Sequence, residues 1–253
     1  MDGAVLDTIL QVSLLVFVLS SMLAMGLSLT VSQIVAPLRS TRLVVIALAL
    51  NFVAVPLLGW GIGKVLSLDE GLATGLVIMA TAAGAPFLPK LAGAAKGDMA
   101  FSVGLMVLLM VVTVAYMPLV LPVLIDGVEV DAWAIASSLV FLMLLPLAIG
   151  LVVRARYQEV AAGLEPYMTQ ASSIAIALLL VAGIVVNFDD IVDLIGTGGF
   201  VAMVLFLGAS LAVGYVSGGA DPGIRSVLGL GTAQRNLSAA LVVAGQNFAD
   251  TPG

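Results

Sequence analysis

Three adjacent polar residues, Gln234, Arg235 and Asn236, interrupt a stretch that is otherwise apolar enough to span a membrane. A guanidinium binds carboxylates and phosphates through paired hydrogen bonds, and neighbouring amides can donate and accept. Ionisable side chains inside a bilayer are costly, and those that occur usually face a cavity or a pathway. This chemistry suits an anionic ligand, and Thr232 and Ser238 add hydroxyl groups on either side.

The apolar segment 71–95 carries a second unusual group of residues. Gly84 is followed by Pro86, Pro89 and Lys90. Proline supplies no backbone N–H and glycine permits non-helical backbone, so we expect the helix to break there. Pro86 and Lys90 are therefore further candidates for substrate binding. The alternative for Lys90 is a snorkelling side chain whose ammonium reaches the lipid head groups.

The composition places these groups in a membrane protein. Of 253 residues, 62% are hydrophobic and 9% are charged, which is typical of a chain embedded in lipid. The charges leave windows close to or longer than the roughly 20 residues that a spanning helix needs. These windows lie at 8–38, 43–63, 71–89, 99–125, 132–153, 166–188 and 194–220, and an eighth segment, 222–248, contains the polar triplet. We therefore predict an all-α polytopic membrane protein with about eight transmembrane segments.

Basic residues in short loops indicate the orientation, because they accumulate on the cytoplasmic side. If the N-terminus is outside, Lys64 falls outside. The other loop cations then fall inside: Arg39, Arg42, Lys96, Arg154, Arg156 and Arg225. The net charge of -6 reflects acidic residues in the outer loops. It does not suggest binding to nucleic acid, which would need a basic face. We expect an integral protein of a bacterial inner (plasma) membrane, surrounded by membrane lipid, with its N-terminus outside.

The two segments with weakened helices form a pair. In this topology, segment 71–95 runs from outside to inside and segment 222–248 runs from inside to outside, where Gly229 and Gly231 loosen the backbone before the polar triplet. Interrupted helices at corresponding places in two inverted halves are the best sequence sign of a transporter's central site. The alternative is two kinked helices packed through small residues. The predicted organisation is one integral membrane domain, 1–253, with pseudo-repeat halves of about 1–125 and 126–253.

At these positions the chain resembles the bile acid:sodium symporter family. The likeness covers nearly the whole chain and rests on Met25-Gly26, on Asn51 to Pro56, on Lys96 to Val103, on Pro118 and on the stretch 229–236. It implies an inverted-repeat helical bundle with two crossed discontinuous helices, an organic anion bound beside the crossing, and alternating access by movement of one bundle against the other. The resemblance further implies that, relative to ten-helix members, this chain would lack the first helix and be truncated before the last.

The resemblance also implies where sodium would bind, and this sequence departs from most of those positions. Leu88 and Pro89 stand in place of a Ser-Asn pair. Gly231 stands in place of a glutamate, and Arg235 in place of a glutamine. The candidate sodium ligands that keep an oxygen-bearing side chain are Asn51 and Thr113.

A fixed guanidinium would repel sodium, so Arg235 disfavours sodium coupling. We infer two possible roles for Arg235: it supplies permanently the positive charge that sodium supplies elsewhere, or it binds a substrate carboxylate bidentately. The chain has no His, which excludes His-dependent catalysis and His-rich metal sites. We expect no cofactor.

The sequence therefore predicts a secondary transporter of a small organic anion and not an enzyme. Two alternatives stay open. A passive channel or a non-transporting membrane subunit would have the same composition. An intramembrane prenyltransferase is the minor alternative, because Asp189-Asp190-Ile-Val-Asp193 matches a motif that holds magnesium-bound diphosphate. The predicted topology places this motif in an outer loop, where an acidic cap on the sixth helix is the simpler interpretation.

Cysteine labelling tests the orientation, because the native chain contains no cysteine. In sealed, right-side-out cells we expect an impermeant maleimide to label Glu129→Cys but not Arg156→Cys, since arginines in short loops stay on the cytoplasmic side. Permeabilised cells are the control in which both variants should react. Labelling of Arg156→Cys in sealed cells would contradict this topology.

Overall fold

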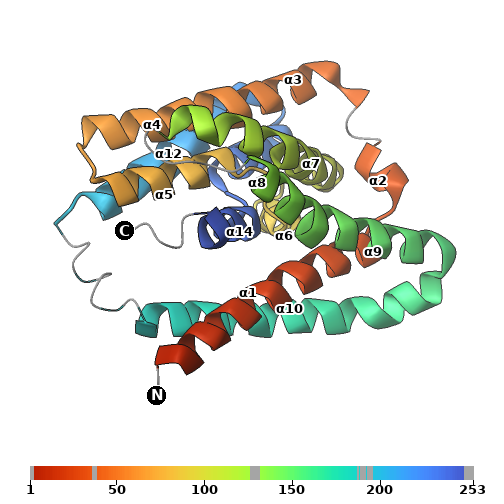
Figure 1. The fold of residues 1–253 in the computed structure, drawn as a ribbon. Helices are drawn as coiled ribbons and strands as arrows, with labels where there is room; N and C mark the ends of the chain where they lie inside the picture. Colours follow the sequence, from red (N-terminus) through yellow and green to blue (C-terminus); the bar gives the residue numbers. More distant parts are fainter. Residues whose placement is uncertain are drawn as a thin grey trace. The chain divides into compact units, whose positions relative to one another are not determined.

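The computed structural model describes residues 3–35, 39–125, 132–186, 188, 192 and 196–247. Within these ranges the chain forms helices and no strand (Figure 1), which confirms the predicted all-helical class. In the first half the elements are α1 Gly3–Ser28, α2 Val31–Val35, α3 Thr41–Ala49, η2 Leu50–Ala54, α4 Val55–Val65, α5 Glu70–Thr81, α6 Leu88–Ala94 and α7 Met99–Leu124. In the second half they are α8 Ala132–Leu139, η3 Val140–Leu144, α9 Leu145–Arg156, α10 Gln158–Val186, α12 Gly199–Ser217, α13 Pro222–Ala233 and α14 Leu237–Asn247.

Five helical stretches within the described residues are long and apolar enough to cross a membrane. They are Thr8–Ser28, Thr41–Val65, Met99–Leu124, Gln158–Val186 and Gly199–Ser217. Each overlaps one of the expected windows, and α8, η3 and α9 follow one another through the window at 132–153. The segments at 71–95 and 222–248 are each divided into two shorter helices. The arrangement of eight spans stays a prediction. The acidic loop 126–131 and the aspartates at 189, 190 and 193 lie outside the described residues.

Two prolines inside long helices are each accompanied by a short π-helical stretch. η2 ends two residues before Pro56, and η3 ends two residues before Pro146. Proline has no N–H to donate, and its ring clashes with the carbonyl of the residue four positions earlier, so a locally wider turn relieves the contact. The helix continues past each proline, and η2 holds Asn51 with its side chain fully buried.

The contacts divide the chain into two compact units, and each unit combines segments from both halves of the sequence. Unit 1 consists of residues 1–30 and 138–196, and unit 2 consists of residues 31–137 and 197–253.

In unit 1, α1 packs against both α9 and α10. The closest approach of α1 to α9 depends on two glycines. A Cβ atom added to Gly150 would lie 2.8 Å from the Cα atom of Gly26 and 2.8 Å from the carbonyl oxygen of Leu23. The two backbones therefore touch without side chains between them, as small residues allow between membrane helices.

In unit 2, a buried apolar cluster joins α4, α5 and α12. Its members are Val55, Leu76, Ala80, Ala202 and Phe206. α12 also packs extensively against α13. These contacts hold the last turn of α5 in place through Ala80, directly before the point where that helix ends.

The close contact between Gly26 and Gly150 in unit 1 can be tested by its effect on stability. We expect Gly150→Ala to lower the free energy of unfolding by about 1–3 kcal/mol, because the added methyl group forces two backbones apart. Gly163→Ala in α10 is the matched control: its Cβ would meet nothing within 4 Å, and alanine favours a helix. Thermal unfolding of the purified protein in detergent measures both variants. A Gly150→Ala protein as stable as Gly163→Ala would contradict the close packing.

Candidate functional site

The first interrupted helix lies in unit 2 between α5 and α6. Residues 82–85 are not helical, and Gly84 has a φ of 81°, a backbone conformation that L side chains rarely adopt. A Cβ atom at Gly84 would also lie 2.6 Å from the Cα atom of Met110 in α7. Pro89 sits in the first turn of α6, where a missing N–H costs nothing. The predicted break is confirmed.

The second interrupted helix lies between α13 and α14, also in unit 2. Residues 234–236 are not helical, so this predicted break is confirmed as well. Gly229 and Gly231, however, are helical residues of α13. A Cβ atom at Gly231 would lie 3.1 Å from Leu88 Cδ2 and 3.2 Å from Leu105 Cδ2. These glycines provide close packing, and the break itself begins at Gln234.

The two breaks are bonded to each other through Asn236, which is completely buried. Its backbone N–H donates to the carbonyl oxygen of Ala82 at 2.8 Å. Its side-chain nitrogen donates to the carbonyl oxygen of Gly84 at 3.1 Å, and its side-chain oxygen accepts from the N–H of Ala239 at 3.1 Å. One residue thus caps α14 and ties the second break to the first.

Arg235 joins three segments of unit 2 and is only 5% exposed. Nη1 donates to the carbonyl oxygen of Ala80 at 3.2 Å. Nη2 donates to Asn51 Oδ1, to the carbonyl oxygen of Thr232 at 2.6 Å and, more weakly, to that of Gly231 at 3.4 Å. The guanidinium therefore lies at the C-terminal ends of both α5 and α13.

The charge of Arg235 matches its surroundings. A helix C-terminus carries roughly -0.5 of an elementary charge, so two such ends together roughly balance one guanidinium. Within the described residues no acidic side chain bonds to Arg235; its partners are carbonyl groups and the Asn51 amide. The buried cation is thus compensated by backbone dipoles.

The two candidate sodium ligands are both engaged in hydrogen bonds. Asn51 Oδ1 accepts from Arg235, and Asn51 Nδ2 donates to the carbonyl oxygen of Ala47 at 3.0 Å. The hydroxyl group of Thr113 donates to the carbonyl oxygen of Ala83 and accepts from its N–H, each at 3.1 Å. Thr113 therefore holds the first break against α7, and Asn51 orients the guanidinium.

Several buried polar atoms of the second broken helix have no hydrogen-bond partner in the described part of the chain. They are Thr232 Oγ1, Gln234 Oε1, Arg235 Nε and Ser238 Oγ. Buried polar atoms in native proteins are almost always bonded, so such atoms invite a ligand or water. The Thr232 hydroxyl faces α12, since a Cβ atom at Gly214 would lie 2.6 Å from it.

The remaining predicted site residues belong to the first broken helix. Pro86 lies half-buried in the turn before α6, and Lys90 lies on α6 itself, with its side chain outside the described part of the structure. The structure adds three acceptors that sequence reasoning missed: the carbonyl groups of Ala80, Ala82 and Gly84. A carbonyl group is present at every residue, so no residue type could have marked these three.

Comparison with known proteins gives one family and two relatives. The profile described as "Sodium Bile acid symporter family" matches residues 14–194. The chain is 26% identical over 195 residues to the probable sodium/metabolite cotransporter BASS3, chloroplastic, of Arabidopsis thaliana, which covers 77% of this chain and 45% of that protein. The Oryza sativa subsp. japonica protein of the same name is 24% identical over 195 residues, with 77% and 46% covered. The chain thus spans less than half the length of these curated relatives.

The pair of hydrogen bonds between Thr113 and Ala83 at the first break can be tested by mutation. We expect Thr113→Val to lower the free energy of unfolding by about 1–3 kcal/mol, because the buried N–H and carbonyl oxygen of Ala83 lose their partner. Thr113→Ser keeps the hydroxyl group and should lose less stability. Thermal unfolding in detergent compares the two. A valine variant as stable as the serine variant would show that this hydrogen-bond pair does not hold the break.

Proposed function

This chain belongs to the sodium bile acid symporter family, and from that premise we propose that it is a secondary transporter that moves a small organic anion across a membrane by alternating access. The observation that carries the proposal is the hydrogen-bonded junction of two interrupted helices at Arg235 and Asn236. Interrupted membrane helices expose backbone groups and helix ends to a ligand, which is why transporters place their substrate sites there.

An anion is the substrate class that fits the charges at this junction. The guanidinium contributes one positive charge, the ends of α5 and α13 contribute roughly -0.5 each, and the beginnings of α6 and α14 contribute roughly +0.5 each. The sum is positive. Without Arg235 the same sum would be close to zero, so this one side chain supplies the positive potential that a substrate meets.

The unpartnered polar atoms supply the specific contacts in this proposal. Nη1 and Nη2 of Arg235 already donate to protein acceptors. Arg235 therefore offers a substrate its Nε–H and a positive potential. It does not offer two free nitrogens for bidentate binding. Gln234 and Ser238 provide the neighbouring amide and hydroxyl groups. Thr232, Asn236, Pro86 and Lys90 complete the proposed substrate-binding set, with Asn236 fixing the backbone.

The proposed transport cycle follows from the interleaved units. Both broken helices belong to unit 2, whereas α1, α9 and α10 belong to unit 1. We assign alternating access to relative movement of these units. The inverted repeat with halves of about 1–125 and 126–253, the eight spans and the external N-terminus are part of the same proposal.

Coupling is proposed to be independent of sodium at the junction. Arg235 already bonds to the carbonyl groups at the ends of α5 and α13, and a second cation beside it would be repelled. Leu88 and Leu105 fill the space beside Gly231, so the side chains nearest to that glycine are apolar and do not compensate an added charge. We propose that the arginine performs permanently the task of a dissociable cation.

Transport by the full-length protein in proteoliposomes tests these points, with a panel of radiolabelled carboxylates as probes. For the carboxylate that is taken up, we expect Arg235→Gln to reduce uptake by about tenfold or more, equivalent to about 1.4 kcal/mol, because the junction loses its net positive charge. Arg235→Lys should retain part of the activity, since it keeps the charge but loses the fork. The matched control is Arg156→Gln, an exposed arginine at the end of α9.

The same vesicles distinguish the alternatives. Uptake should saturate with substrate concentration and should be unchanged when potassium replaces sodium. A strict requirement for sodium would overturn the role of Arg235 as a permanent cation. Uptake that rises linearly with concentration would indicate a channel, and unaltered uptake by Arg235→Gln would remove this residue from the mechanism.

A further inference from the structure

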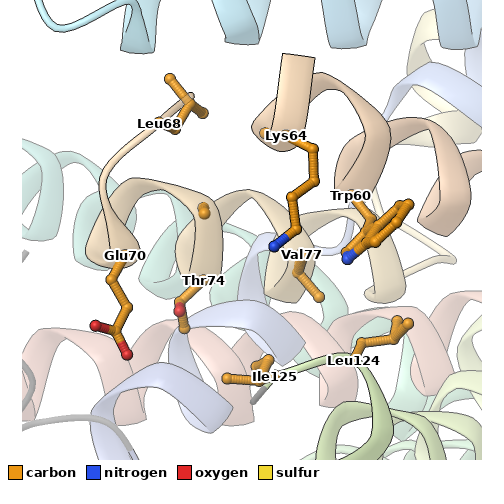
Figure 2. Close-up of a pocket in the computed structure, with 10 residues that line it drawn as sticks. Trp60, Lys64, Leu68, Glu70, Thr74, Val77, Leu124 and Ile125 are labelled. Carbon is orange, nitrogen blue, oxygen red and sulfur yellow. The ribbon is translucent and has the colours of Figure 1, made fainter. Parts of the chain in front are cut away.

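A separate cavity of about 330 Å³ lies in unit 2 where α4 ends, α5 begins and α7 ends (Figure 2). It shares no lining residue with the broken-helix site. Figure 2 shows the side chain of Lys64 reaching from α4 into the space beside Trp60, while Glu70 and Thr74 stand on α5 on the other side. The volume is at the lower end of the range for small-ligand sites, which is roughly 300–1,000 Å³.

The cavity contains one positive and one negative side chain that are not paired with each other. The Lys64 ammonium lies 5.9 Å from the centre of the Trp60 ring, close enough for a cation–π contact. Within the described residues, neither Lys64 nor Glu70 forms an ion pair, and Trp60 Nε1 and the Thr74 hydroxyl make no hydrogen bond. Donors on one wall and acceptors on the other thus face the same space.

The rest of the cavity wall is apolar and lies at the ends of membrane helices. Val77 and Ile125 are buried side chains of this wall, and Leu124 completes it. α4 and α7 are both parts of stretches that are long and apolar enough to span a membrane, and the cavity lies at the last residues of each. Helix ends that carry tryptophan mark the boundary between lipid and water.

We propose that this cavity binds the head group of a phospholipid that carries both a phosphate and a primary ammonium, as phosphatidylethanolamine does. Lys64 and Trp60 Nε1 donate to the phosphate, and Glu70 and Thr74 accept from the ammonium. The apolar wall receives the first carbons of the acyl chains. A choline head group has no N–H to donate to Glu70, and a glycerol head group has no positive charge for it. The site is independent of the proposed transport function.

Tryptophan fluorescence tests the proposal on the full chain in maltoside micelles. The chain contains two tryptophans, so Trp133→Phe leaves Trp60 as the reporter. Dihexanoyl phosphatidylethanolamine should bind roughly threefold to fivefold more tightly than dihexanoyl phosphatidylcholine or phosphatidylglycerol, the scale of an exposed charge pair. Free phosphoethanolamine should bind more weakly than the lipid, since it lacks acyl carbons. Equal affinity for the three lipids overturns the proposal, and equal affinity for free phosphoethanolamine overturns the assignment to a lipid.

Two charge variants localise the binding. In the Trp133→Phe background, Glu70→Gln should abolish the preference for the ethanolamine lipid over the choline lipid. Lys64→Gln should weaken the binding of all three phospholipids. The matched controls are Glu159→Gln and Lys96→Gln, which change exposed residues outside the cavity and should leave the preference intact. A preference that survives Glu70→Gln, or that is lost equally in Glu159→Gln, overturns the assigned site. The comparison of lipids in the Trp133→Phe protein stands even if a charge variant fails to fold.

Discussion

The hydrogen bonds from Arg235 to the ends of α5 and α13 are the interaction on which the arrangement of unit 2 depends. Two helix C-termini brought together in an apolar environment would leave carbonyl groups unsatisfied and place like partial charges side by side. A guanidinium solves both problems, because its planar fork donates in several directions at once. Asn51, 184 positions away in the sequence, supplies the side-chain acceptor that fixes the orientation of the fork.

Around Arg235, some polar groups fix the backbone through hydrogen bonds, and others have no hydrogen-bond partner. Asn236 and Thr113 bond to carbonyl and N–H groups of residues 82–84, and so they determine where the first broken helix turns. Gln234 and Ser238 keep buried polar atoms without partners. A rigid frame beside unsatisfied groups is the arrangement expected of a binding site, because the ligand then completes bonds that the protein has already oriented.

The sequence was sufficient to predict helices, two breaks and the polar triplet at the second break, because proline, glycine and an arginine in an apolar segment are strong local signals. It could not identify what Arg235 bonds to, since backbone carbonyls carry no residue signature. The expectation that Gly229 and Gly231 loosen the backbone was wrong: both lie within α13, where they allow it to pack closely against its neighbours. Likewise, the contact of the Thr232 hydroxyl with α12 depends on tertiary packing, which no spacing reveals.

The interleaving of the two units bears on how the protein is made. α1 leaves the ribosome well before its packing partners α9 and α10, which begin at Leu145 and Gln158. A membrane helix is stable in lipid on its own before it associates with others. α1 therefore stays in the bilayer, with the bare backbone at Gly26 uncovered, until α9 has been synthesised. During that interval the glycine surface of α1 is open to any neighbouring helix, so α1 is a segment where insertion factors that shield nascent helices would act.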